Sequence, residues 1–104
     1  MLGDQVGAAY SWDTLGYVHR HLGDYSLAEA CYQSALELFR DLGIAYSTAD
    51  TLIHLGDTYR QTGDIEAARN AWEQALSVLR DLDHPHATDV QAKLTDLMTT
   101  GRTA

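Results

Sequence analysis

The sequence repeats itself with a period of forty residues, and this periodicity limits the possible folds more than any other feature. The copies align without a gap over most of the chain. A fixed period between 20 and 50 residues is the signature of a stacked repeat array, in which each unit buries its apolar face against a neighbour. We therefore expect two full repeats and part of a third. Identical pairs include Leu15/Leu55, Gly16/Gly56, Arg20/Arg60, Gly23/Gly63, Asp24/Asp64, Ala28/Ala68, Ala35/Ala75, Leu36/Leu76 and Arg40/Arg80.

Within each repeat the apolar residues follow helical spacing, and a Gly-Asp pair separates two such stripes. Glycine ends a helix in the left-handed conformation, and the aspartate that follows can cap the next helix. Each repeat is therefore predicted to be a helical hairpin, with Gly3 and Gly43 at the joints between hairpins. We predict an all-α solenoid of five helices near residues 5–21, 25–42, 45–61, 65–82 and 86–99.

Three aromatic residues, Trp12, Tyr32 and Trp72, stand at positions where the repeat pattern predicts core packing. The first stripe of the first repeat adds Leu15 and Leu22 to the predicted core face, and Gly16 and Gly56 are predicted to be close contacts between helices. The last segment is expected to cap the array with one apolar face. That face consists of Val90, Leu94, Leu97 and Met98.

These patterns resemble the tetratricopeptide repeat (TPR). The first unit reads Trp12-x2-Leu15-Gly16 followed by Gly23-x-Tyr25-x2-Ala28-x3-Tyr32-x2-Ala35, and the second unit repeats the pattern up to Ala75. Two features depart from it: His19 replaces a tyrosine, and Arg40 and Arg80 replace the closing proline. The resemblance implies a single TPR domain over 1–104, with repeats at about 5–42 and 45–82 and a capping helix at about 86–99.

The long units and the tail from Trp72 to Leu94 are similar to the C-terminal repeats of AfsR-like, SARP-type bacterial transcriptional regulators. In those proteins a winged-helix DNA-binding part, an activation part and often an NB-ARC ATPase precede the repeats. The resemblance implies a sensing or coupling role within a multidomain regulator. We expect the chain to be a piece of a longer array; the alternative is a small self-contained protein whose first helix pairs with a second copy.

The charge balance excludes several classes of partner. Seven basic and 15 acidic residues give a formal charge of −8, which repels phosphate backbones and anionic membranes. No apolar run approaches the roughly 20 residues that span a bilayer, and no signal peptide is recognisable. We expect a cytoplasmic protein without direct nucleic-acid or membrane contacts. The single cysteine, Cys31, fits a reducing compartment and a buried packing role.

No pattern in the sequence indicates catalysis. There is no phosphate-binding loop or dinucleotide fingerprint, so no cofactor is expected. His84 and His86 flank a proline at a helix start without a second ligand pair, and we assign no metal site there. His19 and His21 suit the C-terminal end of a helix, where positive charge is favourable. We therefore expect no enzymatic activity.

The surface left for function is the concave side, which the first helix of each hairpin lines. In the TPR family partners dock on the first-helix residues that packing does not use. Carried over position by position, these residues are Tyr10, Asp13, Thr14, Tyr17, Arg20, Asp50, Ile53, His54, Asp57 and Arg60, with Val90, Lys93 and Leu97 continuing the row.

The predicted function is a protein–protein interaction module that holds a protein or peptide segment, either from a partner or from another domain of its parent chain. The family's Lys/Asn clamp for a terminal carboxylate is absent. Asp13, Asp50 and Asp57 predict an acidic groove and a ligand with basic and apolar residues, although Arg20 and Arg60 supply a positive edge. The alternative function is self-association as a homodimer or a small scaffold.

Overall fold

The computed structural model describes residues 2–103, and the side chains of residues 4–99. Over that part of the chain five helices follow one another: α1 (Leu2–His21), α2 (Tyr25–Leu42), α3 (Ala45–Thr62), α4 (Ile65–Asp81) and α5 (His86–Thr103). They confirm the all-α prediction. The bounds of α2, α3 and α4 agree with the predicted ones to within one residue. The first helix begins earlier and the last ends later than predicted, so Gly3 lies inside α1 rather than at a joint.

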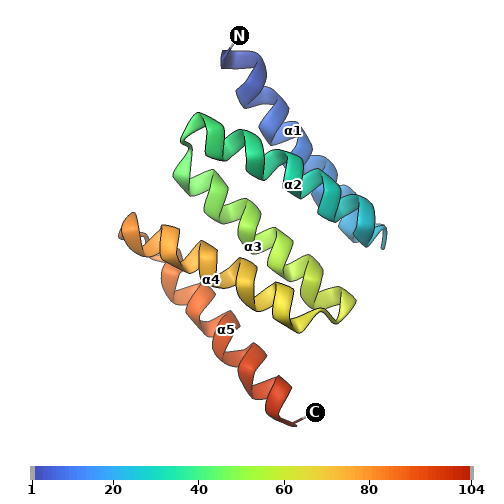
Figure 1. Ribbon diagram of the computed structural model, residues 1–104, viewed down its shortest axis with the longest axis vertical. Helices are drawn as coiled ribbons and strands as arrows, with labels where there is room; N and C mark the ends of the chain where they lie inside the picture. The colour runs from blue at the N-terminus through green and yellow to red at the C-terminus, as the bar shows by residue number, and fades with distance from the viewer. Residues whose placement is uncertain (1, 104) are drawn as a thin grey trace.

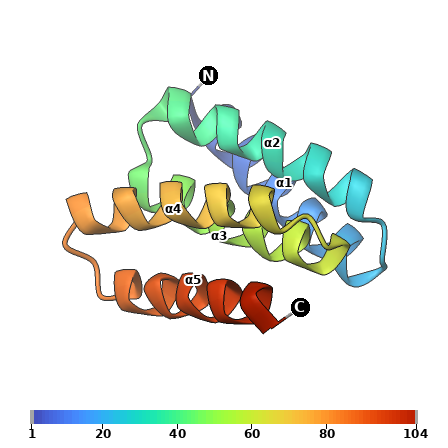
Figure 2. The same cartoon turned by 60° about the horizontal axis from the view of Figure 1, so that its bottom comes forward.

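The helices stack as antiparallel pairs in two layers. Figures 1 and 2 show α2 and α4 in one layer and α1, α3 and α5 in the other, with α1 and α5 at opposite ends of the array. Each helix packs on its neighbours in sequence, and α1 also touches α3. The molecule measures 49 × 33 × 16 Å, which is the flat, elongated shape of a short solenoid. No helix in the described residues is long and apolar enough to cross a membrane.

The turns have the predicted glycine helix ends and aspartate caps, except that Asp24 does not cap α2. Gly23, Gly43 and Gly63 take positive φ values of 84°, 71° and 87°, which end the preceding helices in the left-handed conformation. Asp64 accepts a hydrogen bond from the Ala67 N–H at 3.2 Å and caps α4 as predicted. Asp24 makes no such bond, because its carboxylate faces the His19 ring, with Oδ2 3.8 Å from Nδ1.

The core lies between the two layers and is built on aromatic–glycine contacts. Tyr32 and Trp72 are buried as predicted. A methyl group added at Gly16 would lie 2.7 Å from the Tyr32 ring, and one at Gly56 would lie 2.3 Å from the Trp72 ring. The Trp72 indole also donates to the Ile53 carbonyl at 3.1 Å. Only glycine therefore lets these helix pairs approach so closely.

One part of the core prediction is wrong. Trp12, Leu15 and Leu22 on α1 are exposed, whereas the equivalent Leu52 and Leu55 on α3 are buried beneath α2. The reason is positional: α2 covers α3, but no helix in the described residues covers this side of α1. Met98 on α5 is likewise exposed rather than part of the capping face.

Candidate functional site

The predicted partner-binding residues lie along α1 and α3 on what we call the first-helix face, the side of the α1–α3–α5 layer directed away from α2 and α4. The structure brings many of them into contact across these helices. They fall into three groups, which are described in turn from the N-terminal end of α1 to its C-terminal end.

Two tyrosines on α1 supply the aromatic part of this face. The Tyr10 hydroxyl lies 2.9 Å from Ser47 Oγ on α3, and the Tyr10 ring packs edge-on against Phe39 at 4.9 Å between centroids. Tyr17 lies about two helical turns further along. Both rings remain half exposed. Thr14, between them, is exposed and donates to the Tyr10 carbonyl, so this end offers apolar surface with hydroxyl groups.

A carboxylate–imidazole cluster occupies the middle of the face. Asp13 on α1 accepts a hydrogen bond from the Thr51 hydroxyl at 3.1 Å and lies 3.4 Å from His54 Nδ1. His54 Nε2 lies 3.8 Å from Asp50, one turn earlier on α3. Burial lowers the pKa of His54, but the hydrogen bond to Asp13 and the charges of both carboxylates outweigh it, so the net shift is upward. The cluster therefore favours a protonated imidazole that joins α1 to α3.

The same three residues have the composition of a small cation site. One ligand atom from each of Asp13, Asp50 and His54 lies within 4.8 Å of the others. The protonated imidazole lies beside both carboxylates and balances one of their two negative charges, which accounts for the grouping as an internal ion-pair cluster. Sequence reasoning missed this cluster, although the Asp50-x3-His54 spacing places both side chains on one helix face.

Asp57 is the centre of the third group and links three helices. Its carboxylate lies 3.6 Å from Arg20 Nη1 on α1 and 3.0 Å from Lys93 Nζ on α5. The two cations also stack on aromatic rings: Arg20 lies 5.8 Å from the Tyr17 centroid, and Lys93 lies 5.3 Å from the Trp72 centroid. Asp57 is therefore internally neutralised.

A cleft of 510 Å³ opens beside this ion-pair group. Four of its lining residues were predicted from the sequence as part of the groove or its continuation. Gln61 and Ile65 were not, because they belong to the end of α3 and the start of α4 rather than to the repeating first-helix positions. The lining residues are Arg20, Asp57, Arg60, Gln61, Ile65 and Lys93.

Arg60 differs from its repeat equivalent, Arg20, in having no acidic partner among the described residues. Arg20 pairs with Asp57, which lies 37 residues later. The residue 37 positions after Arg60 is Leu97, a buried apolar residue of α5 that cannot form an ion pair. Because the repeat supplies the arginine but not the second carboxylate, the Arg60 side chain is exposed at the cleft and forms no ion pair with the described residues.

Two buried polar atoms close to this face have no hydrogen-bond partner among the residues that the structure describes: Arg20 Nε and the Tyr32 hydroxyl. Burial raises the pKa of Tyr32 to about 12; the Arg20 charge opposes this rise, and the charges of Asp13 and Asp57 add to it. The phenol therefore stays protonated. Unsatisfied buried groups of this kind are uncommon in native proteins and require an explanation such as a bound group.

Two expectations for this face are wrong. Val90 and Leu97 do not continue the groove, because they are 1% and 2% exposed and pack against α4. The groove is also less acidic than expected, because Asp13 and Asp57 already have partners within the protein. Ile53 is partly buried against the core, so its side chain is only partly available to a ligand.

Comparison with known proteins supports the repeat assignment. Residues 5–81 match a family model described as the tetratricopeptide repeat. Among solved structures, the fold is similar to the N-terminal domain of stress-induced protein-1 (STI-1) from C. elegans, with a TM-score of 0.75 and 15% identity. The alignment covers 86% of this chain and 67% of that chain. Identity this low shows the fold alone. No curated protein matches the sequence.

Proposed function

The chain belongs to the tetratricopeptide repeat family, and from that premise we propose that it is a protein-interaction module that binds a peptide segment of a partner along the first-helix face. The segment would run from the two tyrosines toward the cleft at Arg60. We propose no catalytic role, because the carboxylates and the imidazole of this face are engaged in ion pairs rather than arranged around a reacting atom.

The observation that carries the proposal is the position of Arg60 at the cleft without an ion-pair partner among the described residues. Three cationic side chains line this cleft, and Asp57 is the carboxylate among them. A cationic group without an ion-pair partner among the described residues is available to a ligand, and electrostatic complementarity then favours an acidic partner.

This balance of charges changes the expected chemistry of the ligand. The expectation of a basic segment depended on free aspartates, but Asp13 and Asp57 are paired. We propose instead a segment that places a carboxylate against Arg60 and an apolar side chain against Tyr10 and Tyr17. Aromatic and arginine side chains are the residue types that most often carry binding energy at interfaces.

Selection of random peptides displayed on phage tests this proposal, because the peptide library itself supplies the ligands. Peptides selected on the wild-type chain should be enriched in Asp and Glu, and their binding should weaken at least tenfold in Arg60→Glu and also with increasing salt. The matched control is Arg69→Glu on α4, which reverses an exposed arginine outside this face. Peptides without acidic residues, or equal loss in both variants, would contradict the proposal.

The broader context that we propose is the sensing or coupling part of a multidomain bacterial transcriptional regulator in the cytoplasm. The support is the similarity of the long units and the Trp72–Leu94 tail to AfsR-like proteins, and the buried free thiol of Cys31, which suits a reducing compartment. Measurement of the mass of the native protein with an antibody to this chain tests the idea. A mass of 11.5 kDa would contradict it.

A further inference from the structure

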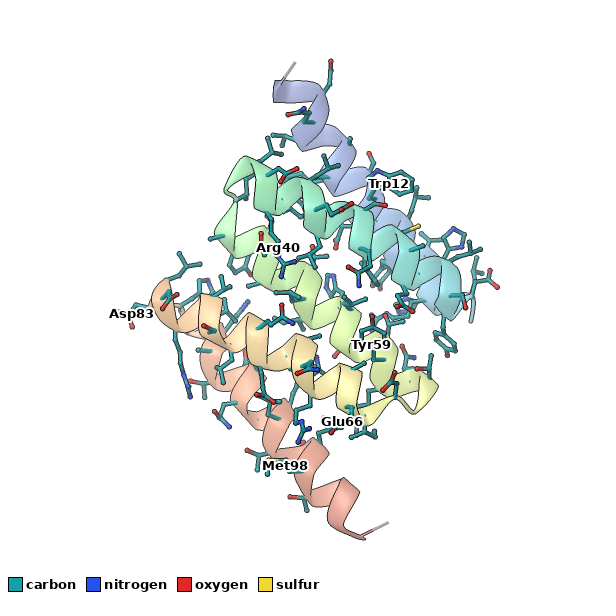
Figure 3. The ribbon with its side chains drawn as sticks, viewed as in Figure 1. Trp12, Arg40, Tyr59, Glu66, Asp83 and Met98 are labelled. Carbon is teal, nitrogen blue, oxygen red and sulfur yellow. The ribbon has the colours of Figure 1, made fainter. Side chains whose placement is uncertain are left out.

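An uncovered apolar strip runs along the outer side of α1. Trp12, Leu15, Val18 and Leu22 are 40%, 44%, 44% and 70% exposed, although their three- and four-residue spacing is that of a buried helix face. Figure 3 shows Trp12 at this end of the array. A contiguous set of large exposed apolar side chains marks an interaction site.

The second repeat shows what this strip is suited to contact. At the equivalent positions of α3, Leu52 packs against Leu36 of α2, and Leu55 packs against Ala28 and Tyr32. Trp12 and Leu15 of the strip therefore occupy positions that are buried in a helix–helix interface in the second repeat, whereas Leu22 corresponds to the exposed Thr62. A further helix is the occupant that fits such a face.

The two ends of the array are not complementary. On α5 the exposed side chains are mainly polar or charged, such as Asp89, Gln91, Thr95 and Asp96, and Met98 is the large apolar residue exposed there among the described residues. A head-to-tail contact between copies would thus place an apolar strip against a polar helix. A two-fold contact, in which the same strip meets itself, avoids this mismatch and closes at two copies.

The strip can pair with a second copy of itself when the two helices are centred on Leu15. In an antiparallel pair centred on Leu15, positions at equal distances on either side face one another. Ala8 then meets Leu22 of the partner subunit, a small residue against a large one, and Trp12 meets Val18 of the partner subunit. Ser11 meets His19 of the partner subunit, which gives a hydroxyl opposite an imidazole. The heptad spacing of residues 8, 15 and 22 suits such a helix pair.

The positions that would meet in this pairing carry no carboxylate. None of the residues at positions 8, 11, 12, 15, 18, 19 and 22 is a carboxylate, although the chain has 15 acidic residues and a net charge of −8. We propose that the chain forms a symmetric dimer in which α1 packs antiparallel against α1 of a second copy, centred on Leu15. This proposal does not depend on the peptide-binding proposal, because Tyr10, Asp13 and Tyr17 lie on roughly the opposite side of α1.

Sedimentation velocity and light scattering of the 104-residue chain over a range of concentrations test the dimer. The wild type should approach twice 11.5 kDa, and Leu15→Glu should remain a monomer with an unchanged helical circular dichroism spectrum, because residue 15 faces its own copy. Met98→Glu is the matched control at the other end of the array and should dimerise normally (Figure 3). Added salt should favour the dimer by screening the like net charges of the subunits.

Cross-linking supplies a second readout that does not depend on dimer strength. In a Cys31→Ser background, Leu15→Cys should form an intermolecular disulfide under mild oxidation, whereas Met98→Cys should not. A wild-type chain that stays monomeric at all concentrations would overturn the proposal, as would a dimer that Leu15→Glu leaves intact. If Leu15→Glu abolished binding of a different protein instead, the strip would belong to that partner. Arg60→Glu should leave the dimer unchanged, so failure of either proposal can be recognised separately.

Discussion

At the scale of single residues, two glycines determine how closely the hairpins close. Gly16 and Gly56 each receive the ring of an aromatic residue sixteen positions later, Tyr32 and Trp72. The Trp72 ring has little freedom to move, because it is buried and its indole N–H is bonded to the Ile53 carbonyl. The absence of a side chain at position 56 is therefore a packing requirement rather than a need for flexibility.

Gly56→Ala should destabilise the protein by about 1–3 kcal/mol, because the added methyl would overlap the Trp72 ring. Gly7→Ala is the control: Gly7 is an exposed helical residue with no atom within 4 Å of an added methyl, and the substitution should stabilise α1 by about 0.5–1 kcal/mol. Urea unfolding followed by circular dichroism measures both. Equal stability of the two variants would show that the close approach has been misassigned.

At the scale of elements, the two hairpin turns have the same sequence but different caps. Asp64 caps α4 through the Ala67 N–H, whereas the Asp24 carboxylate faces His19. We expect Asp64→Ala to cost about 1 kcal/mol, as is typical for loss of an N-cap. Asp24→Ala should cost less, because it removes no cap. Paired urea melts give the two values, and a larger loss for Asp24→Ala would contradict these cap assignments.

The contact between α1 and α3 should depend on pH through His54. Its pKa is raised in the folded protein by Asp13 and Asp50, against the effects of burial and of Arg20. A raised folded pKa means that the stabilisation is fully present below the ordinary value of about 6.5 and is lost as the pH rises through the higher folded value. The free energy of unfolding should therefore fall as the pH rises from 6 to 8.

His54→Gln isolates this contribution, because glutamine can still bond to Asp13 but does not titrate. The variant should show a smaller fall in unfolding free energy than the wild type over the same pH range, with chemical denaturation as the measurement. A variant with an unchanged pH profile would assign the dependence to another group.

The elements themselves follow closely from the sequence. Gly-Asp turns and three- and four-residue spacing predict α2, α3 and α4 to within one residue, because these signals depend on local backbone preference. The spacing also shows that Trp12 and Leu15 share a face. It does not show whether another helix covers that face, because burial depends on how the helices pack in three dimensions and the spacing within one helix does not determine that. The burial of Trp12 was therefore predicted wrongly.

At the scale of the whole molecule, Asp57 ties the first-helix layer together by contacting Arg20 of α1 and Lys93 of α5. Asp57→Asn should cost about 1–3 kcal/mol, because it weakens two charged interactions and leaves the largely buried Arg20 without its carboxylate. The difference from wild type should shrink at 1 M salt. Unfolding at two salt concentrations measures it; a difference that does not respond to salt would indicate a packing defect instead.

The candidate site could be predicted only in part, and the missing part depends on distances between helices. Repeat position predicts that Arg20, Asp57 and Arg60 share one side of the array, and all three line the same cleft. Their ion-pair partners could not be deduced from position, since Asp57 pairs with Lys93, 36 residues away in sequence. The Asp13–His54 pair escaped prediction for the same reason: it joins two helices whose relative rotation the sequence pattern leaves open.

Because the two tryptophans have different surroundings, intrinsic fluorescence can report on two parts of the protein separately. Trp12 on α1 is 40% exposed, whereas the Trp72 indole is 2% exposed and hydrogen-bonded. Their fluorescence should therefore differ in wavelength and in sensitivity to dissolved quenchers. Loss of quenching at Trp12 would signal that α1 has been covered, and a red shift from Trp72 would signal that the core has opened. The two events can then be followed in one unlabelled sample from the emission wavelength and the quenching of the two tryptophans.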